Sequence, residues 1–224
     1  MKKLIGLLIF TLVPLVVFSQ RNADYGVFGG VSSYFGDINP EKMLYSPRPA
    51  AGMFYRYNLH PRHSLRANLF AGGLRANDTD FNNSFQQNRA ASFSGTVAEL
   101  ALQFEFNFFP YSTEGKKWNY TPYFAAGVGG AYINTNEDVM FCPVIPVTFG
   151  FKINIKKNLG LEAEYGFRKT FYDNFDGVEN PTYAWTHNND WYTFTGVCIT
   201  WKVFSNLAKC AVYNDFDAKR KRKR

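Results

Sequence analysis

Residues 94–108, SGTVAELALQFEFNF, alternate between apolar and polar side chains almost without interruption. Successive side chains of a β-strand point to opposite faces, so this stretch predicts a strand with one apolar and one polar face. The apolar set is Ala98, Leu100, Leu102, Phe104, Phe106 and Phe108, and the polar face carries Glu99, Ala101, Gln103, Glu105 and Asn107. A run of this length exceeds the about five or six residues typical of soluble strands.

Seven more stretches predict strands, which gives eight in all. The alternation is clear in residues 64–75, 145–155 and 159–170, and weaker in residues 24–35, 49–58, 121–135 and 191–204. Phe70 and Leu74 blur the upper half of the stretch at 64–75. We therefore predict an all-β chain that folds as an eight-stranded antiparallel up-and-down barrel. A soluble barrel would turn its apolar faces inward, whereas a transmembrane barrel turns them toward lipid and encloses polar side chains.

Three features favour the transmembrane arrangement. Several strands reach the ~9–11 tilted residues that cross a bilayer. Aromatic side chains gather near the predicted strand ends, where a membrane-interface girdle places them; they are Tyr55, Tyr57, Tyr111, Trp118, Tyr120, Tyr123, Trp185, Trp191 and Trp201. Long polar connections at 37–48, 76–89, 136–143 and 172–190 alternate with short turns at 60–63 and 156–158, with 111–119 intermediate. We expect the short turns to face the periplasm.

The first 19 residues have the pattern of a secretory signal peptide. Lys2 and Lys3 precede an apolar run at 4–18, and Ser19 follows as a small residue suited to a cleavage site. We expect cleavage after Ser19, a barrel over residues 20–204 and a periplasmic tail over residues 205–224. The predicted location is the outer membrane of a Gram-negative-type envelope.

The formal charge of +7 is unevenly distributed. Eight of the 25 basic residues lie at the two ends of the chain: Lys2, Lys3, Lys219, Arg220, Lys221, Arg222, Lys223 and Arg224. The rest of the chain has 17 basic and 18 acidic residues. The positive charge therefore belongs to a tail, and we expect no nucleic-acid partner for an exported chain. The tail is either simply solvated or docks an acidic partner.

The eight charged side chains on the polar strand faces have mixed signs, and we expect them inside the barrel. They are Arg56, Arg66, Glu99, Glu105, Lys152, Glu162, Glu164 and Arg168. An eight-stranded barrel is only wide enough for its own side chains, so these groups should pair and plug the lumen. A proton or ion path through them is the alternative.

The stretch YFGDI ends the first predicted strand. We expect Tyr34 and Phe35 at the outer rim, with Gly36 and Asp37 beginning the first outer loop. Asp37 is then a turn former that accepts hydrogen bonds from backbone N–H groups, and a general base is the alternative.

No constellation of residues predicts an enzyme, a cofactor, a metal site or a small-molecule substrate. His187 with Ser84, Ser92 or Ser94 is the alternative of a lipid-modifying barrel enzyme, but spacing does not single these residues out. His60 and His63 alone do not make a metal site. Cys142, Cys198 and Cys210 fit no zinc or redox motif; they are either unpaired thiols or include a Cys198–Cys210 bridge.

The last strand contains a candidate assembly signal. Gly196, Ile199 and Trp201, with Phe204 as the closing aromatic residue, have spacings like those of the C-terminal signal of outer-membrane barrels. One more amphipathic strand is the alternative reading.

The order of several motifs resembles a known family. YFGDI after a glycine-rich strand, the hairpin RPAAGMFYRYNLHPRHSLRANLFAG and the ending TWKVF are similar to the PorG-type outer-membrane protein of the type IX secretion system. The resemblance implies a non-enzymatic component of the secretion and gliding machinery that contacts its periplasmic ring and outer-membrane translocon. The alternatives are the lipid-modifying enzyme and a plain adhesin or envelope-stabilising barrel. The basic end has no counterpart in the family pattern.

Overall fold

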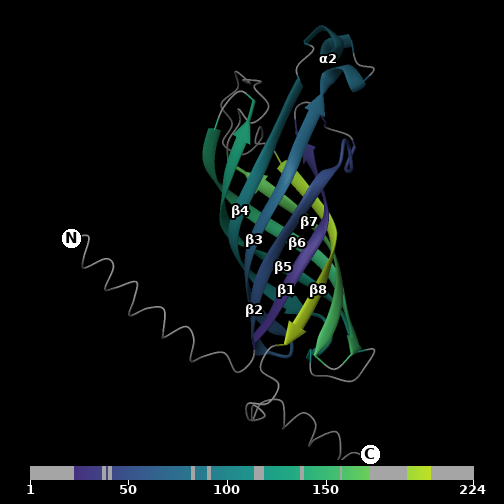
Figure 1. Ribbon diagram of the computed structural model, residues 1–224, viewed down its shortest axis with the longest axis vertical. Coiled ribbons are helices and arrows are strands. Elements are labelled where there is room, and N and C mark those ends of the chain that lie inside the picture. Colours follow the sequence, from purple (N-terminus) through teal and green to yellow (C-terminus); the bar gives the residue numbers. More distant parts are fainter. Residues whose placement is uncertain are drawn as a thin grey trace, which may run out of the picture.

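The computed structural model contains one closed antiparallel barrel (Figure 1). It describes residues 23–36, 39, 42–81, 84–89, 92–113, 119–136, 139–156, 158–171 and 191–202. The strands are β1 (Ala23–Phe35), β2 (Arg48–His60), β3 (His63–Asn77), β4 (Ser92–Asn107), β5 (Tyr120–Thr135), β6 (Val139–Lys156), β7 (Leu159–Thr170) and β8 (Trp191–Lys202). Each strand pairs with its neighbours in sequence, and β8 closes on β1. The predicted fold class is confirmed.

The strands are strongly staggered around the barrel. The ladder that starts at Ala23 passes through all eight strands and returns to β1 at Ser33, ten residues farther along. Such a stagger tilts the strands by roughly 35–45° from the barrel axis. Strands of 12 to 18 residues are therefore long enough to cross a bilayer and extend beyond it.

The barrel has an apolar outside and a charged inside. In β4, Leu100, Leu102 and Phe104 are exposed on the outer wall, while Glu99 and Glu105 are fully buried in the lumen. Phe149 and Ile199 are also exposed on the outer wall. The alternation therefore has the polarity of a transmembrane barrel, as predicted.

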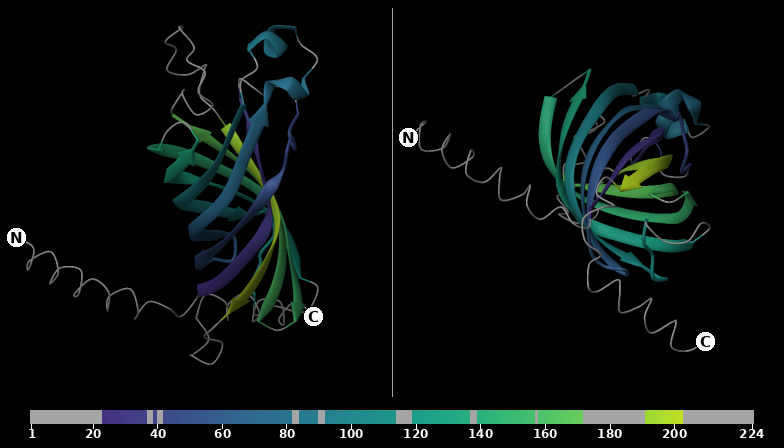
Figure 2. Two further views of the ribbon diagram at one scale, coloured as in Figure 1. Left: turned by 45° about the horizontal axis from the view of Figure 1, so that its top comes forward. Right: turned by 60° about the horizontal axis from the view of Figure 1, so that its bottom comes forward.

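We call the end of the barrel that carries α2 the upper end, and the end with the turns after β2, β4 and β6 the lower end (Figure 1). The β3–β4 hairpin rises above the other strands at the upper end (Figure 2). Its connection contains a 3₁₀ turn, η2 (Asp78–Asp80), and a short helix, α2 (Ser84–Arg89). The sequence did not predict these helical turns, since each is too short to show helical periodicity. Among the described residues, no helix has the length and apolar content needed to cross a membrane.

The predicted long connection at 136–143 is wrong. β6 begins at Val139, so the connection after β5 is short. Residues 139–144 are apolar or Cys on both faces: Val139 and Phe141 point outward, and Met140 and Cys142 point inward. Because both faces are apolar, this part of β6 lacks the alternation that marked the other strands.

The predicted aromatic girdle is only partly correct. Tyr120 and Trp201 are exposed on the outer wall, and Tyr55 stacks edge-on against Tyr25 near the lower end. Tyr111 and Tyr123, however, are buried inside the barrel. Tyr57 and Trp191 are half-buried, and Trp118 and Trp185 lie outside the described residues.

Candidate functional site

The lower half of the lumen holds a lattice of paired charges centred on Arg56. Its guanidinium donates from Nε to Glu105 at 3.0 Å and from both terminal nitrogens to Glu162 at 2.7 Å. Lys152 donates to the second oxygen of Glu105. These side chains are essentially inaccessible to solvent, yet each guanidinium or carboxylate faces a charged partner.

A second part of the lattice lies around Arg66. Its guanidinium contacts both oxygens of Glu164, and the hydroxyl of Tyr123 donates to the same carboxylate. Its Nε donates to Asn68 at 2.6 Å. Arg56, Arg66 and Lys152 thus balance Glu105, Glu162 and Glu164 in number, which allows the whole group to be buried in its charged form.

An aromatic layer lies directly above the lattice. Phe28 packs edge-on against Phe194 at 5.0 Å between ring centroids and stacks on Phe70 at 6.0 Å. The Arg66 guanidinium lies 3.8 Å from the ring centroid of Phe54, a cation–π contact that joins the layer to the charges below. The sequence had indicated Phe70 only as a break in the pattern.

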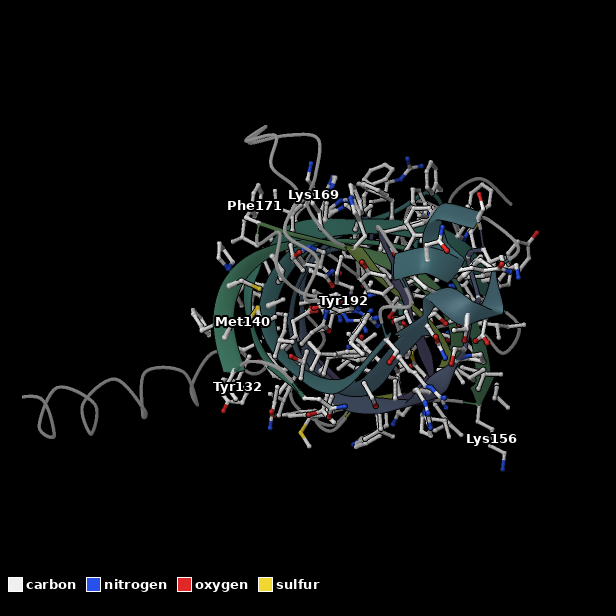
Figure 3. The ribbon with its side chains drawn as sticks, turned by 90° about the horizontal axis from the view of Figure 1, so that it is seen from above. Tyr132, Met140, Lys156, Lys169, Phe171 and Tyr192 are labelled. Atoms are coloured by element: carbon white, nitrogen blue, oxygen red, sulfur yellow. The ribbon has the colours of Figure 1, made fainter. Side chains whose placement is uncertain are left out.

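Above this layer, Glu99 and Arg168 form a looser ion pair. The distance from Arg168 Nε to the Glu99 carboxylate is 3.5 Å, and Tyr192 donates a hydrogen bond to the same carboxylate oxygen. Tyr192 lies inside the ring of strands in the view from above (Figure 3). Neither Nε nor Nη1 of Arg168 has a hydrogen-bond partner among the described residues. All eight charged residues assigned to the lumen are therefore buried there, but they form two groups.

Beyond the Glu99–Arg168 pair, most of the large side chains buried at the upper end are apolar. They include Leu74, Phe81, Phe93, Val97, Ile133 and Met140. On the outer wall at the same end, Ser92, Ser94 and Arg75 are exposed. In the β3–β4 hairpin, the outer face is therefore apolar over the lower part and polar at the upper end, where the inner face is apolar.

The segment after β4 folds under the lower mouth of the barrel. Tyr111 donates through its backbone N–H to the Pro61 carbonyl at 3.0 Å and through its hydroxyl to Asn154. The Asn154 amide in turn donates to the Ser112 carbonyl at 2.7 Å, and the Asn158 N–H donates to the Thr113 carbonyl at 3.2 Å. We call residues 108–113 the strap. Burial raises the pKa of the Tyr111 phenol, with a further contribution from Glu162, so Tyr111 remains protonated.

In the stretch YFGDI, the Tyr34 side chain points into the barrel. Tyr34 is fully buried inside the upper lumen, where its ring packs edge-on against Phe93 at 4.8 Å. Asn39 fixes the following loop by donating to the carbonyls of Tyr34 and Lys42 at 2.9 and 2.6 Å. Gly36 donates its N–H to the Asn39 carbonyl at 3.2 Å. Asp37 lies outside the described residues, so both of its predicted roles stay predictions.

The first upper loop is tied to η2. The Tyr45 hydroxyl donates to the Asp80 carboxylate, and the Tyr45 and Phe81 rings lie 5.0 Å apart. Lys42 Nζ lies 4.8 Å from the centroid of the Phe81 ring. Burial and the neighbouring Asp80 raise the pKa of Tyr45 to about 12. The described part of the first upper loop is therefore held against the β3–β4 connection.

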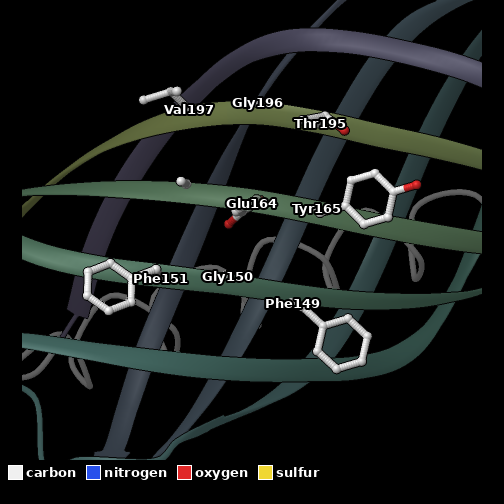
Figure 4. A pocket seen from close by; sticks show the side chains of 9 residues that line it. Phe149, Gly150, Phe151, Glu164, Tyr165, Thr195, Gly196 and Val197 are labelled. Atoms are coloured by element: carbon white, nitrogen blue, oxygen red, sulfur yellow. The ribbon is translucent and has the colours of Figure 1, made fainter. Parts of the chain in front are cut away.

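Two shallow hollows on the outer wall are formed by residues that the structure describes. One, of about 550 Å³, lies over β6, β7 and β8 and is bordered by Phe149, Phe151, Tyr165 and Val197 (Figure 4). The other, of about 600 Å³, lies over β2, β3, β4 and β5. Both are lined largely by apolar side chains on the face that meets lipid.

The remaining sequence candidates do not form a catalytic or metal site in the part of the chain that is described. Within it, no group of three or more His, Cys, Asp or Glu side chains is placed to hold a metal ion. Ser84, Ser92 and Ser94 are exposed at the upper end, whereas His187 lies outside the described residues. Cys142 and Cys198 are buried free thiols, and Cys210 is also outside the description.

The candidate assembly signal is only partly described. Ile199 and Trp201 point outward from β8 and are exposed, and Gly196 approaches the backbone of Gly29 in β1. Phe204 and residues 219–224 lie outside the described part of the chain. The roles of the signal and of the tail remain predictions.

Comparisons with known proteins match the chain to one family model and to solved structures of similar fold. The family model described as "Domain of unknown function (DUF6089)" matches residues 2–212. Neisserial surface protein A has a similar structure, with a TM-score of 0.51 and 11% identity over 81% of this chain and 97% of that one. The outer membrane protein OprG from Pseudomonas aeruginosa gives a TM-score of 0.46 and 10% identity, covering 82% of this chain and 98% of OprG. Ail of Yersinia pestis gives a TM-score of 0.41 and 12% identity, covering 80% of this chain and 97% of Ail. No curated protein sequence matches. At such low identities the likeness concerns the fold alone.

Proposed function

Because this chain belongs to the DUF6089 family and its barrel has a filled lumen, we propose that it is a non-enzymatic anchor in the outer membrane. The observation that carries the proposal is the charge lattice of Arg56, Arg66 and Lys152, covered above by an aromatic layer and below by the strap. A barrel packed in this way does not conduct ions. Its activity then resides in its two ends and its outer wall.

The location and orientation are part of the proposal. The apolar outer wall and the enclosed charges support insertion in a membrane, and the expected signal peptide at residues 1–19 supports export. The two longest connections, after β3 and β7, both lie at the upper end, which supports an upper end that faces outward. The lower end and residues 205–224 then face the periplasm.

We assign the anchor to the type IX secretion and gliding machinery, on the basis of the resemblance of YFGDI, the β2–β3 hairpin and TWKVF to the PorG-type protein. The periplasmic ring proteins and the outer-membrane translocon are the partners, contacted through the lower turns and the tail. The basic run Lys219 to Arg224 would suit an acidic surface on the ring.

The decisive test compares a deletion strain with strains that carry the full chain or a chain lacking residues 207–224. Loss of the protein should stall export of cargo with C-terminal sorting domains, and the full chain should restore it. The truncated chain should insert in the membrane but bring down less of the ring in gentle detergent. Normal export in the deletion strain would end the assignment to this machinery.

A plain adhesin or envelope-stabilising barrel is the second candidate. At the upper end, Tyr45 of the first loop contacts Asp80 of η2 and Lys42 contacts the adjacent Phe81, and these contacts favour a role outside the cell. A strain that exports cargo normally but loses surface binding or envelope integrity would support this candidate. The variant His187→Ala tests the third alternative, a lipid-modifying enzyme. It should abolish lipid modification if the chain is such an enzyme, and it should have no effect on an anchor or an adhesin.

A further inference from the structure

The hollow over β2 to β5 is a consequence of the register of four strands. Ala51 pairs with Ala71, Ala71 with Ala98, and Ala98 with Tyr132, so three methyl groups form a floor that ends at a tyrosine wall. All three alanines are exposed on the outer wall. The hollow has a volume of about 600 Å³, within the about 300–1,000 Å³ typical of ligand pockets.

Large apolar side chains border the hollow on its lower side. Met53, Leu69 and Leu100 occupy the next outward row toward the lower end, and they are 57%, 49% and 63% exposed. A chain lying on the alanine floor would contact these side chains along one edge and Tyr132 at its end. Tyr132 points outward from the barrel in Figure 3.

The upper side of the hollow is polar and basic. Gly73 and Thr96 pair at this edge, and Arg75 follows two residues farther along the same face of β3. The Arg48 side chain lies against Gly73, since a Cβ on Gly73 would be only 2.9 Å from Arg48 Cβ. The Cβ of Arg48 and the exposed Arg75 therefore lie beside the upper edge of the apolar hollow.

We propose that this hollow binds a phosphorylated, multi-acylated glycolipid of the outer leaflet, of the lipid A type. The alanine floor takes an acyl chain, and Arg48 and Arg75 take a phosphate at the depth where the wall turns from apolar to polar. Arginine is well suited to phosphate because its planar guanidinium can donate two parallel hydrogen bonds. The inference rests on the proposed orientation, in which the upper end lies in the outer leaflet.

The hollow over β6 to β8 provides a matched control. It is similar in volume, about 550 Å³, and its floor includes Ala163. Its border of Phe149, Phe151, Tyr165 and Val197 is apolar and aromatic. The next basic residue on the outward face of β7 is Lys169, four residues beyond Tyr165, because Arg168 is buried in the lumen. It suits a lipid tail of any kind, without selection for a phosphate.

The test uses the full chain in nanodiscs of neutral phospholipid, with bound lipid measured by native mass spectrometry. The probes are bis-phosphorylated lipid A, dephosphorylated lipid A and phosphatidylglycerol. The unaltered protein should prefer the bis-phosphorylated probe. The double variant Arg48→Gln/Arg75→Gln should bind that probe roughly tenfold more weakly and the dephosphorylated one equally well. Ala71→Leu/Ala98→Leu should weaken both lipid A probes, and Ala163→Leu should weaken neither.

Equal binding of phosphatidylglycerol, or unchanged lipid A binding in both double variants, would overturn the inference. Heat-modifiable migration on gels checks that each variant folds. If the leucine variants do not fold, the comparison of the unaltered protein with the arginine variant decides the test. Labelling of Ser92→Cys on intact cells tests the orientation separately. Export of cargo in the same strains separates a failure of lipid binding from a failure of the proposed function.

Discussion

Arg56 in β2 and Glu162 in β7 lie 106 positions apart in sequence and are joined across the lumen by two hydrogen bonds of 2.7 Å. The same guanidinium also donates to Glu105 of β4. One side chain therefore links three strands of the barrel. The pairing depends on the ten-residue stagger, which brings residues from distant strands to one level.

Removing the Arg56 guanidinium should strongly destabilise the barrel. Arg56→Met leaves Glu105 and Glu162 facing a buried space with less positive charge, and breaking a buried pair costs about 3–5 kcal/mol. Urea unfolding in lipid vesicles measures the change in the free energy of unfolding. Lys156→Met is the control, since Lys156 is exposed at the lower end of β6 and points away from the barrel in Figure 3. Equal stability of the two variants would contradict the structural role of the lattice.

The strap should respond in a graded way to changes at Tyr111. Tyr111→Phe removes only the hydroxyl that donates to Asn154 and should cost about 1 kcal/mol. Tyr111→Ala removes the buried ring and should cost roughly 3–5 kcal/mol, by analogy with other buried aromatic residues. Hydrogen exchange should then quicken at the Asn158 amide, which donates to the Thr113 carbonyl.

Phe109→Ala is the control for the strap, because Phe109 is 51% exposed in the same segment. It should leave exchange at Asn158 unchanged. Protection at Asn158 that survives Tyr111→Ala would show that the strap does not depend on the inserted ring.

Alternation predicted the two faces of β4 and β7 from sequence, since period two assigns every second side chain to the same side. It could not say that large apolar side chains fill much of the upper lumen. Phe70 and Leu74 share the inward face of β3 with Arg66, so they appeared as irregularities. The strap was not predicted because Tyr111 belongs to no periodic segment. The pairing of Arg56 with Glu162 could not be predicted, because it depends on the register between strands and on the stagger of the barrel. The alternation within one strand contains neither.

The contact between the first upper loop and η2 should weaken at high pH. The pKa of Tyr45 is raised from 10.0 to about 12, so the folded state favours the protonated phenol. The resulting stabilisation is fully present below pH 10 and is lost as the pH rises through about 12. The difference in the ultraviolet absorbance of tyrosinate between the unaltered chain and Tyr45→Phe should correspond to one phenol that ionises near pH 12. A titration curve that is identical in Tyr45→Phe would contradict this assignment.

The outer wall of β4 provides a direct test of membrane insertion. Leu102 is 65% exposed near the middle of the outward apolar face of residues 98–108, so Leu102→Arg would place a charge in hydrocarbon. The expected cost is about 2–4 kcal/mol in the free energy of unfolding from lipid vesicles. Ser92→Arg is the matched substitution on the exposed upper part of β4, and it should change stability little, because that part of the wall is polar. The difference between the two variants measures the polarity change along a single strand. If arginine is tolerated equally well at both positions, hydrocarbon does not surround Leu102, and the transmembrane placement of the barrel is wrong.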